Sequence, residues 1–189
     1  MLTGIGGQGV QLAAQVLARA AVADGRNALL FGTYLGAMRG GNTDATVVVA
    51  DGPVLAPPII SRTWAAVALH HQHWPDLRPK VRREGVVVVD ASVFVGEPFA
   101  DDPAPPAVIE LPATDIATAL GNEMAASMVM CGALAALTGL VTVDSVVAGM
   151  QEALPPYRAQ HAPLNETAIR AGADAVTTDD HPAWHEVVA

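Results

Sequence analysis

The sequence predicts an α/β domain of three layers, with a mainly parallel, Rossmann-like sheet and extra helices towards its C-terminus. Short apolar runs alternate with stretches of helical periodicity through the first two thirds of the chain, as strands joined by crossover helices do. The 189 residues are enough for one domain with a hydrophobic core. Hydrophobic residues make up 51% and charged residues 15% of them, a composition that excludes a disordered chain.

The first predicted unit consists of a strand, a glycine turn, a helix and a second strand. Residues 2–5 run straight into glycines, and the apolar positions from Val10 to Ala21 recur at helical spacing. Gly25 supplies a left-handed end for this helix. Residues 27–31 then have the short apolar form of a buried parallel strand, so the segment is expected to form a βαβ unit.

Four more strands are expected in the middle of the chain, separated by polar or glycine-rich loops. They cover residues 44–50, 64–69, 86–90 and 107–111. Pro75 and Pro79 lie in the polar crossover between the second and third of these strands, and they permit only a short helix there.

Helices are expected from residue 114 onwards. They cover residues 115–120, a long stretch rich in Ala and Met that starts at Asn122, residues 143–154 and residues 157–171. Thr114 and Thr142 are expected to cap the first and the third of them. The predicted organisation is therefore one domain over residues 1–172, followed by a polar tail over residues 173–189.

Residues 124–143 are the one run long enough to suggest a membrane span, because 20 residues follow one another without a charge. The run is rich in Ala, is interrupted by glycines and has acidic flanks without a nearby Lys or Arg, which disfavours a span. We therefore expect a buried helix and no membrane association. Because this helix is apolar nearly all round, it is predicted to face another chain.

The acidic balance of the chain argues against a nucleic-acid binder, because 10 basic residues stand against 19 acidic ones. The first 84 residues carry 8 basic and 5 acidic side chains, whereas the remainder carry 2 and 14, so an anion site is expected in the first half. The single cysteine, Cys131, can neither form an internal disulfide nor hold an iron–sulfur cluster alone. With no secretory signal in MLTGIGGQG, a cytoplasmic protein is expected.

A glycine-rich turn after the first strand is the first candidate binding site. Gly4, Gly6 and Gly9 fit the pattern G-x-G-x-x-G, with Gly7 and Gln8 between them. Bare backbone N–H groups at the start of a helix favour a phosphate or a carboxylate. The alternative is that the glycines only let the helix cross tightly over the sheet. A conventional nicotinamide site is disfavoured, because the second strand ends without the acidic residue that binds the ribose.

Arg39, Gly40 and Gly41 form the second candidate binding element. They follow the second strand, on the side where ligands bind in open α/β sheets. An arginine between small residues can contact a phosphate, a carboxylate or the backbone of a partner. The alternative is a solvated loop arginine.

Two further clusters are interpreted as surface features. His70, His71 and His73 diverge too strongly for a tetrahedral metal site, so no metal is expected there. The basic run from Arg78 to Arg83 is typical of a solvated face or of a surface that complements an acidic partner. No serine-hydrolase elbow, phosphate-loop lysine or thiol redox pair is present, and no residue is assigned to catalysis.

Four segments, taken together and in order, resemble the γ subunit of 2-oxoacid:ferredoxin oxidoreductases, which is similar to domain III of the single-chain pyruvate:ferredoxin enzymes. The segments are GIGGQGVQLAAQVLARAA at 4–21, TYLGAMRGGNTDATVVVAD at 33–51, VVVVDASVF at 86–94 and LPATDIATALGNEMAASMVMCGALAALTGL at 111–140. The stretch before Arg39 lacks an acidic residue that many relatives carry, and is closer to the branched-chain-like variants.

The resemblance implies a subunit of a thiamine diphosphate enzyme that oxidatively decarboxylates a 2-oxoacid, with coenzyme A, to an acyl-CoA. It implies partner α and β subunits, which hold thiamine diphosphate and Mg, and an iron–sulfur or ferredoxin-type subunit. This chain alone is expected to bind no cofactor and to be inactive. The alternative is a stand-alone nucleotide-binding or regulatory Rossmann-like protein.

The resemblance also assigns residues to ligand binding, with coenzyme A or an acidic group of a partner as the candidate anion. The assigned positions are Gly4, Gly6, Gly7, Gln8, Gly9, Arg39, Gly40, Gly41 and Asn122.

Overall fold

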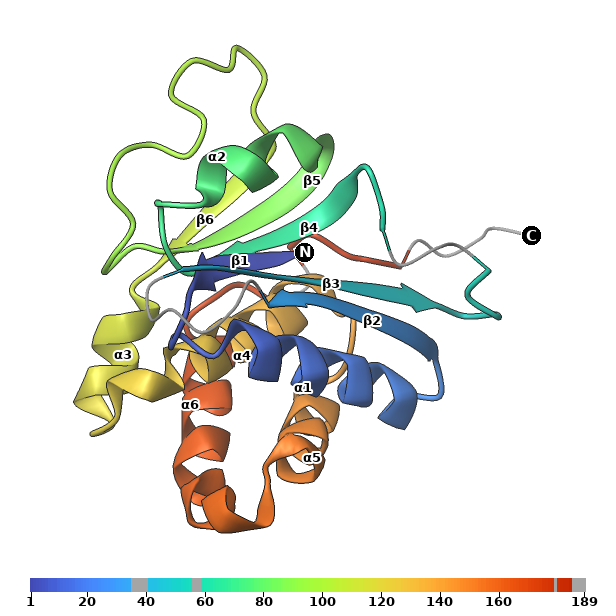
Figure 1. The fold of residues 1–189 in the computed structure, drawn as a ribbon, viewed down its shortest axis with the longest axis vertical. Coiled ribbons are helices and arrows are strands. Elements are labelled where there is room, and N and C mark those ends of the chain that lie inside the picture. The colour runs from blue at the N-terminus through green and yellow to red at the C-terminus, as the bar shows by residue number, and fades with distance from the viewer. Residues whose placement is uncertain (35–40, 56–58, 179, 185–189) are drawn as a thin grey trace.

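The computed structural model describes residues 1–34, 41–55, 59–178 and 180–184, whose strands form one six-stranded sheet in the order β2-β3-β1-β4-β5-β6 (Figure 1). The strands are β1 (Leu2–Ile5), β2 (Asn27–Tyr34), β3 (Asn42–Ala50), β4 (Thr63–Ala68), β5 (Val81–Asp90) and β6 (Ala107–Leu111). The β1–β4, β4–β5 and β5–β6 pairs are parallel, whereas β3 pairs antiparallel with β1 and β2. The prediction of an α/β fold with a mainly parallel sheet is confirmed.

The prediction of a βαβ unit with a buried parallel second strand is wrong. β3 lies between β1 and β2, and its register with β2 runs from Asn27 opposite Ala50 to Tyr34 opposite Thr43. Pairing β2 with β3 closes a shorter loop than pairing β2 with β1 across the intervening helix would, and so costs less chain entropy. β2 becomes an edge strand, and Phe31 is 39% exposed.

Helices cover the two faces of the sheet unequally (Figure 1). The α-helices are α1 (Val10–Ala23), α2 (Trp74–Leu77), α3 (Ala113–Ala119), α4 (Ala126–Thr138), α5 (Val143–Ala153) and α6 (Ala162–Asp174), and the 3-10 helices are η1 (Arg78–Lys80), η2 (Glu123–Ala125) and η3 (Pro156–His161). α1 and α4 lie under the sheet, with α5 and α6 packed on them from outside. The opposite face carries α2, η1 and a long loop, where Trp74, Leu77 and Phe99 form a small second core against β4 and β5.

Several predicted boundaries agree closely with the structure. β6 covers the predicted residues, α2 is a single short helix, and the Oγ1 of Thr142 accepts a hydrogen bond from the N–H of Ser145 as an N-cap does. Other boundaries differ: β2 extends to Tyr34 and β5 begins at Val81. The long helix and the last predicted helix begin as the 3-10 helices η2 and η3, before α4 and α6 start.

The prediction that Thr114 caps α3 with its own side chain is wrong. Thr114 lies inside α3, and the buried carboxylate of Asp90 accepts hydrogen bonds from the Thr114 N–H at 3.1 Å and from its Oγ1 at 2.6 Å. A carboxylate at a helix start satisfies free N–H groups and suits the helix dipole. Sequence reasoning looks for a cap next to the helix, whereas this one comes from the end of β5.

α4 is the centre of the helical side, and the prediction that it faces another chain is wrong. All 13 of its residues are buried within this chain, because α1, α3, α5 and α6 surround it. Apolarity all round a helix indicates burial but does not say which chain provides it. No described helix is long and apolar enough to cross a membrane.

Glycines allow α4 and α6 to cross with their backbones in contact. A Cβ atom on Gly132 would lie 1.8 Å from the carbonyl oxygen of Ile169, and one on Gly172 would lie 1.9 Å from that of Val129. A similar contact joins α5 to α1, where a Cβ on Gly149 would lie 2.6 Å from the carbonyl oxygen of Val16. Side chains of any size would separate these helices.

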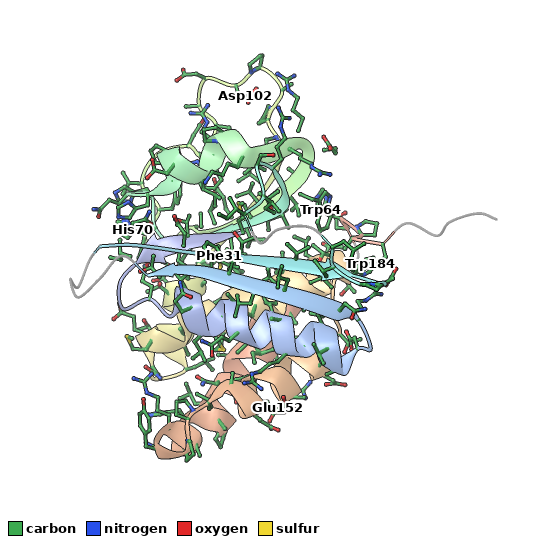
Figure 2. All side chains as sticks on the ribbon, turned by 45° about the vertical axis from the view of Figure 1, so that its right-hand side comes forward. Phe31, Trp64, His70, Asp102, Glu152 and Trp184 are labelled. Atoms are coloured by element: carbon green, nitrogen blue, oxygen red, sulfur yellow. The ribbon has the colours of Figure 1, made fainter. Side chains whose placement is uncertain are left out.

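The chain after α6 packs back onto the end of α4. The N–H groups of His181 and Ala183 donate to the carbonyls of Leu137 and Thr138 at 3.0 and 2.7 Å. The guanidinium of Arg26 stacks 3.6 Å from the centre of the Trp184 ring, which Figure 2 shows at the end of the sheet. The described part of the predicted polar tail is therefore docked on the domain.

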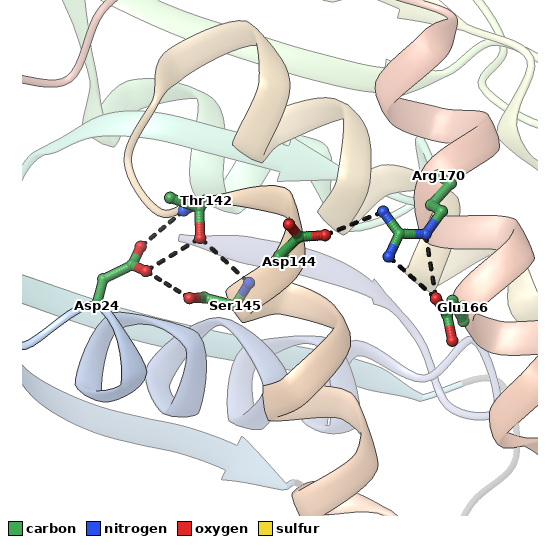
Figure 3. Close-up of polar contacts among 6 residues, drawn as sticks. All are labelled: Asp24, Thr142, Asp144, Ser145, Glu166 and Arg170. Carbon is green, nitrogen blue, oxygen red and sulfur yellow. Dashed lines mark hydrogen bonds and ion pairs between the residues drawn. The ribbon is translucent and has the colours of Figure 1, made fainter.

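Asp24, just after α1, ties this helix to α5 (Figure 3). Its carboxylate accepts hydrogen bonds from the Thr142 N–H at 2.7 Å, from the Thr142 Oγ1 at 3.0 Å and from the Ser145 hydroxyl. Partial burial raises the pKa of Asp24, but these hydrogen bonds and the charge of Arg26 outweigh it, so the pKa lies below its usual value of 3.8.

The contact between α4 and α6 predicts the effect of adding one methyl group. Gly132→Ala should lower the free energy of unfolding by about 3 kcal/mol, since a Cβ there meets backbone that cannot move aside. Gly52→Ala is the matched control, because a Cβ at Gly52 has no heavy atom within 4 Å, and its effect should stay below about 1 kcal/mol. Urea unfolding followed by circular dichroism measures both. Equal stabilities would show that the helices separate easily.

The lowered pKa of Asp24 predicts a pH-dependent contribution to stability. A depressed carboxyl pKa stabilises the folded state above the unfolded value of 3.8, and this contribution is lost as the pH falls through the folded pKa. Asp24→Asn should therefore cost about 1 kcal/mol at neutral pH, the size of a helix-cap loss, and progressively less as the pH falls below 3.8. Asp174→Asn, at an exposed position, is the control. Denaturant melts at several pH values test this; a cost independent of pH would contradict it.

Candidate functional site

The predicted glycine turn joins β1 to α1 in a backbone conformation that requires glycine. Gly7 and Gly9 have φ values of 110° and 80°, and Gly9 is the N-cap residue of α1. No side chain caps α1, and no acidic residue lies in its first turn. The first N–H groups of the helix are therefore available to an anion, as the motif predicts.

Gln8 holds this turn in place and is not available to a ligand. Its Oε1 accepts the N–H of Ile5 at 2.9 Å, and its Nε2 donates to the carbonyl of Leu69 at 2.9 Å. A Cβ on Gly4 would lie 2.7 Å from the same Oε1, so Gly4 makes room for this side chain. Of the predicted binding residues, Gly4 and Gln8 thus shape the turn.

The glycine turn contacts Gly41, which is the one residue of the second predicted binding element that the structure describes. The N–H of Gly6 donates to the carbonyl of Gly41 at 2.9 Å. Arg39 and Gly40 lie outside the described residues. The expectation that both elements meet at one edge of the sheet therefore holds for Gly41, and the position of the Arg39 side chain stays a prediction.

A cavity of about 340 Å³ lies at the glycine turn, between α1, α4 and α6. Gly7 and Gly9 line it together with Asn122, which is the third predicted element. Arg158 and His161 of η3 complete the lining on the α6 side. We refer to it as the glycine-turn cavity.

Three helix N-termini meet at this cavity. Its lining includes Gly9 at the start of α1, Ser127 at the start of α4 and His161 at the start of α6. α1 and α6 have no side-chain cap and no acidic residue in the first turn, whereas α4 continues from η2, which is capped by the Asn122 side chain and carries Glu123. Because each N-terminus carries about half a positive charge, the cavity favours an anion.

The other lining residues of the cavity include both buried polar side chains and apolar side chains. Ser127 and Asn165 are only 2% and 6% exposed, and neither side chain makes a hydrogen bond within the described residues. Leu12, Met124 and Leu154 add apolar surface. Unused polar groups beside apolar walls are typical of a site for an organic anion.

Sequence reasoning missed Arg158, His161, Ser127 and Asn165. The charge count placed the anion site in the first half of the chain, and η3 lies in the acidic half. One signal was available: Arg158 is one of only two basic residues after residue 84. Nothing in the sequence indicates that η3 lies next to the glycine turn in the folded chain.

The histidine cluster lies just after the end of β4, in the segment that leads to α2. The rings of His70 and His71 stack with centres 4.3 Å apart, and burial, followed by the charges of His71 and His73, lowers the pKa of His70. In the part of the chain that the structure describes, no three His, Cys, Asp or Glu side chains are placed to hold a metal.

A second cavity, of about 690 Å³, lies under the loop that carries Asp102 (Figure 2). Arg62, Arg78 and Arg83 line it beside aromatic rings, so part of the basic run does face a hollow. Asp102 and Glu97 also line this cavity, and none of the predicted binding residues that the structure describes reaches it. The glycine-turn cavity is therefore the candidate site.

Cys131 does not supply a nucleophile. Burial in α4 raises the pKa of its thiol to about 12, so the thiol stays protonated at neutral pH. The described lining of the glycine-turn cavity offers groups that can bind an anion, and Cys131 is not among them.

The chain matches the family described as pyruvate ferredoxin/flavodoxin oxidoreductase over residues 1–175, and it belongs to this family. The 2-oxoglutarate synthase subunit KorC of Methanothermobacter thermautotrophicus is 32% identical over 93% of both chains. Ketoisovalerate oxidoreductase subunit VorA of the same organism is 30% identical over 76% of this chain and 28% of its own length. Pyruvate synthase subunit PorC, also of that organism, is 31% identical over 80% of this chain and 82% of its own length.

Solved structures agree with this assignment. The gamma subunit of the keto/oxoacid ferredoxin oxidoreductase from Geobacter sulfurreducens superposes with a TM-score of 0.76 at 27% identity, covering 92% of this chain and 93% of that chain. A 2-oxoglutarate:ferredoxin oxidoreductase from Magnetococcus marinus shares the fold, with a TM-score of 0.77 at 19% identity over 95% of this chain and 31% of that chain. The predicted family, a gamma-type subunit of 2-oxoacid:ferredoxin oxidoreductases, is confirmed.

Proposed function

We propose that this subunit works in a thiamine diphosphate-dependent complex that converts a 2-oxoacid and coenzyme A to an acyl-CoA, and that it contributes assembly and part of the coenzyme A site. The uncapped start of α1 at the glycine turn, which lines this cavity together with Arg158 and His161, carries this proposal. Coenzyme A has a diphosphate, which suits such a cavity. The 2-oxoglutarate:ferredoxin oxidoreductase from Magnetococcus marinus was solved with 2-oxoglutarate, coenzyme A and succinyl-CoA bound.

The redox chemistry belongs to partner chains in this proposal. Thiamine diphosphate with Mg, held by α and β subunits, supplies the carbanion chemistry of decarboxylation, and an iron–sulfur or ferredoxin-type subunit receives the electrons. The one cysteine of this chain is buried in α4, which supports a role without a cluster of its own. The relatives are named for different 2-oxoacids at nearly equal identity, so we propose the reaction class and not one substrate.

The isolated chain should be catalytically silent. We expect no reduction of methyl viologen with pyruvate, 2-oxoglutarate or 2-oxoisovalerate plus coenzyme A, because the thiamine diphosphate and the iron–sulfur clusters of the reaction are proposed to be held by partner chains. The complex purified from the native source through this subunit should be active with at least one of them. Turnover by the isolated chain would overturn the subunit role. Recovery of this chain alone from the native source would favour the stand-alone alternative.

Arg39 is proposed to contact a phosphate of coenzyme A from the loop before β3. Arg39→Ala should raise the KM for coenzyme A roughly tenfold or more, because a hydrogen bond to a charged group is worth about 1.5 to 3 kcal/mol. Assembly, followed by size-exclusion chromatography, should not change. Arg19→Ala is the control, since Arg19 pairs with Glu152 on the helical side. A loosened complex with an unaltered KM would instead assign Arg39 to a partner.

A further inference from the structure

The cavity of about 690 Å³ that Arg62, Arg78 and Arg83 line has no part in the function proposed so far, and we refer to it as the arginine hollow. None of these three side chains forms an ion pair within the described residues, where the ion pairs involve other basic side chains. This is unusual in a chain with 19 acidic residues and 10 basic ones. Three cations are therefore gathered at one place where they can meet charges from outside the chain.

The buried part of the arginine hollow is apolar and held by contacts within the chain. The rings of Trp74 and Phe99 meet edge to face with centres 5.5 Å apart, and the guanidinium carbon of Arg78 lies 5.4 Å from the centre of the Phe99 ring. The indole N–H of Trp74 donates to the carbonyl of Pro98 at 2.8 Å, which ties α2 to the long loop beside it (Figure 1). The buried lining residues are all apolar: Trp74, Pro98, Phe99 and Pro106.

The distribution of polar groups indicates a polypeptide as the occupant rather than a small molecule. Arg62 and Arg83 are exposed, Arg78 is half-buried, and the apolar Val95 beside them is 72% exposed. Among the described residues, no buried polar side-chain atom that lacks a hydrogen-bond partner borders this hollow. Small-molecule sites orient their ligand with polar groups at depth, whereas protein interfaces combine an apolar, Arg- and aromatic-rich centre with a polar rim.

The positions of the charges indicate an acidic partner. Glu97 and Asp102 also line the hollow, but both lie on the loop that Figure 2 marks with Asp102. Arg62, Arg78 and Arg83 come instead from the start of β4, from η1 and from β5. A second copy of this chain that bound through the same surface would bring arginines against arginines. The sheet side of the hollow therefore suits carboxylates from a different chain.

Resting on the proposed role in assembly, we propose that the arginine hollow docks an acidic segment of a partner subunit. An apolar side chain of this segment fills the space over Trp74 and Phe99, and its carboxylates pair with Arg62, Arg78 and Arg83. Arg78 is the central contact, because it is the least exposed of the three and its planar guanidinium can donate two parallel hydrogen bonds to a carboxylate. Arg62 and Arg83, at the exposed rim, mainly increase the rate of association.

A photo-cross-linker in the hollow identifies the occupant. The complex is assembled with p-benzoylphenylalanine in place of Val95, irradiated and digested, and the cross-linked peptides are sequenced by mass spectrometry. We expect a peptide of another subunit that is rich in Asp or Glu. Val22 is the matched control position, because it is also an exposed valine, at 61%, but lies on α1, on the helical side of the sheet. A cross-linker there should not capture the same peptide.

Charge reversal at Arg78 tests the ion pairs. Arg78→Glu should raise the Kd of this chain for the rest of the complex roughly tenfold or more, because a carboxylate would then face carboxylates. Arg78→Lys should lose less, since it keeps the charge but not the planar fork. Raising NaCl from about 0.1 M to about 1 M should weaken the wild type more than Arg78→Glu, because salt screens attraction between charges. Arg19→Glu, at an exposed arginine of the helical side, is the control and should assemble as the wild type does.

The contrary outcomes separate this inference from the function beneath it. If the wild-type chain joined no other chain, the proposed function and this inference would both fail. If the complex formed but Arg78→Glu assembled with wild-type affinity, only this inference would be overturned. Cross-links from position 95 that reached only this chain, a second copy of it or a segment without acidic residues would also overturn it. Circular dichroism confirms the folding of each variant, and the cross-link decides the question should Arg78→Glu misfold.

Discussion

The crossing of α4 over α6 is the contact on which the rest of the helical side depends. Gly132 and Gly172 bring the two backbones together, and α4 in turn lies against α1 and α3. Close backbone packing leaves little freedom to slide or rotate, since interiors are packed as densely as organic crystals. The starts of α4 and α6 are therefore fixed relative to each other, and the groups Ser127 and Asn165 are fixed with them.

The same contact explains how a binding cavity arises from segments that are far apart in the chain. Gly9 lies so close to α4 that a Cβ there would be 2.6 Å from the Ser127 hydroxyl. α1 is held from the other side by α5, through Gly149 and through the carboxylate of Asp24 (Figure 3). The starts of α1, α4 and α6 thus come together because small residues let the helices approach closely, although only α1 follows a recognisable binding motif.

Much of the fold and less of the site could be predicted from the sequence. Local signals were reliable: turn glycines, prolines around α2 and the cap at Thr142 act within a few residues. The glycine turn, Gly41 and Asn122 were predicted because they stand in recognisable motifs. The insertion of β3, the cap from Asp90 and the return of Arg158 to the turn depend on pairings across the chain. Periodicity reports burial at such positions but not the neighbour that provides it.

The hydrogen bonds of Gln8 have a consequence for how a ligand would be received. Its amide links the end of β1 to the end of β4, so the conformation of the turn is held by hydrogen bonds within the protein itself. A phosphate that binds there would not have to order a flexible loop, so little of the binding free energy would be offset by a loss of conformational entropy in the turn. Tight association could be reached with few direct contacts, and the rates of capture and release would reflect desolvation more than rearrangement of the protein.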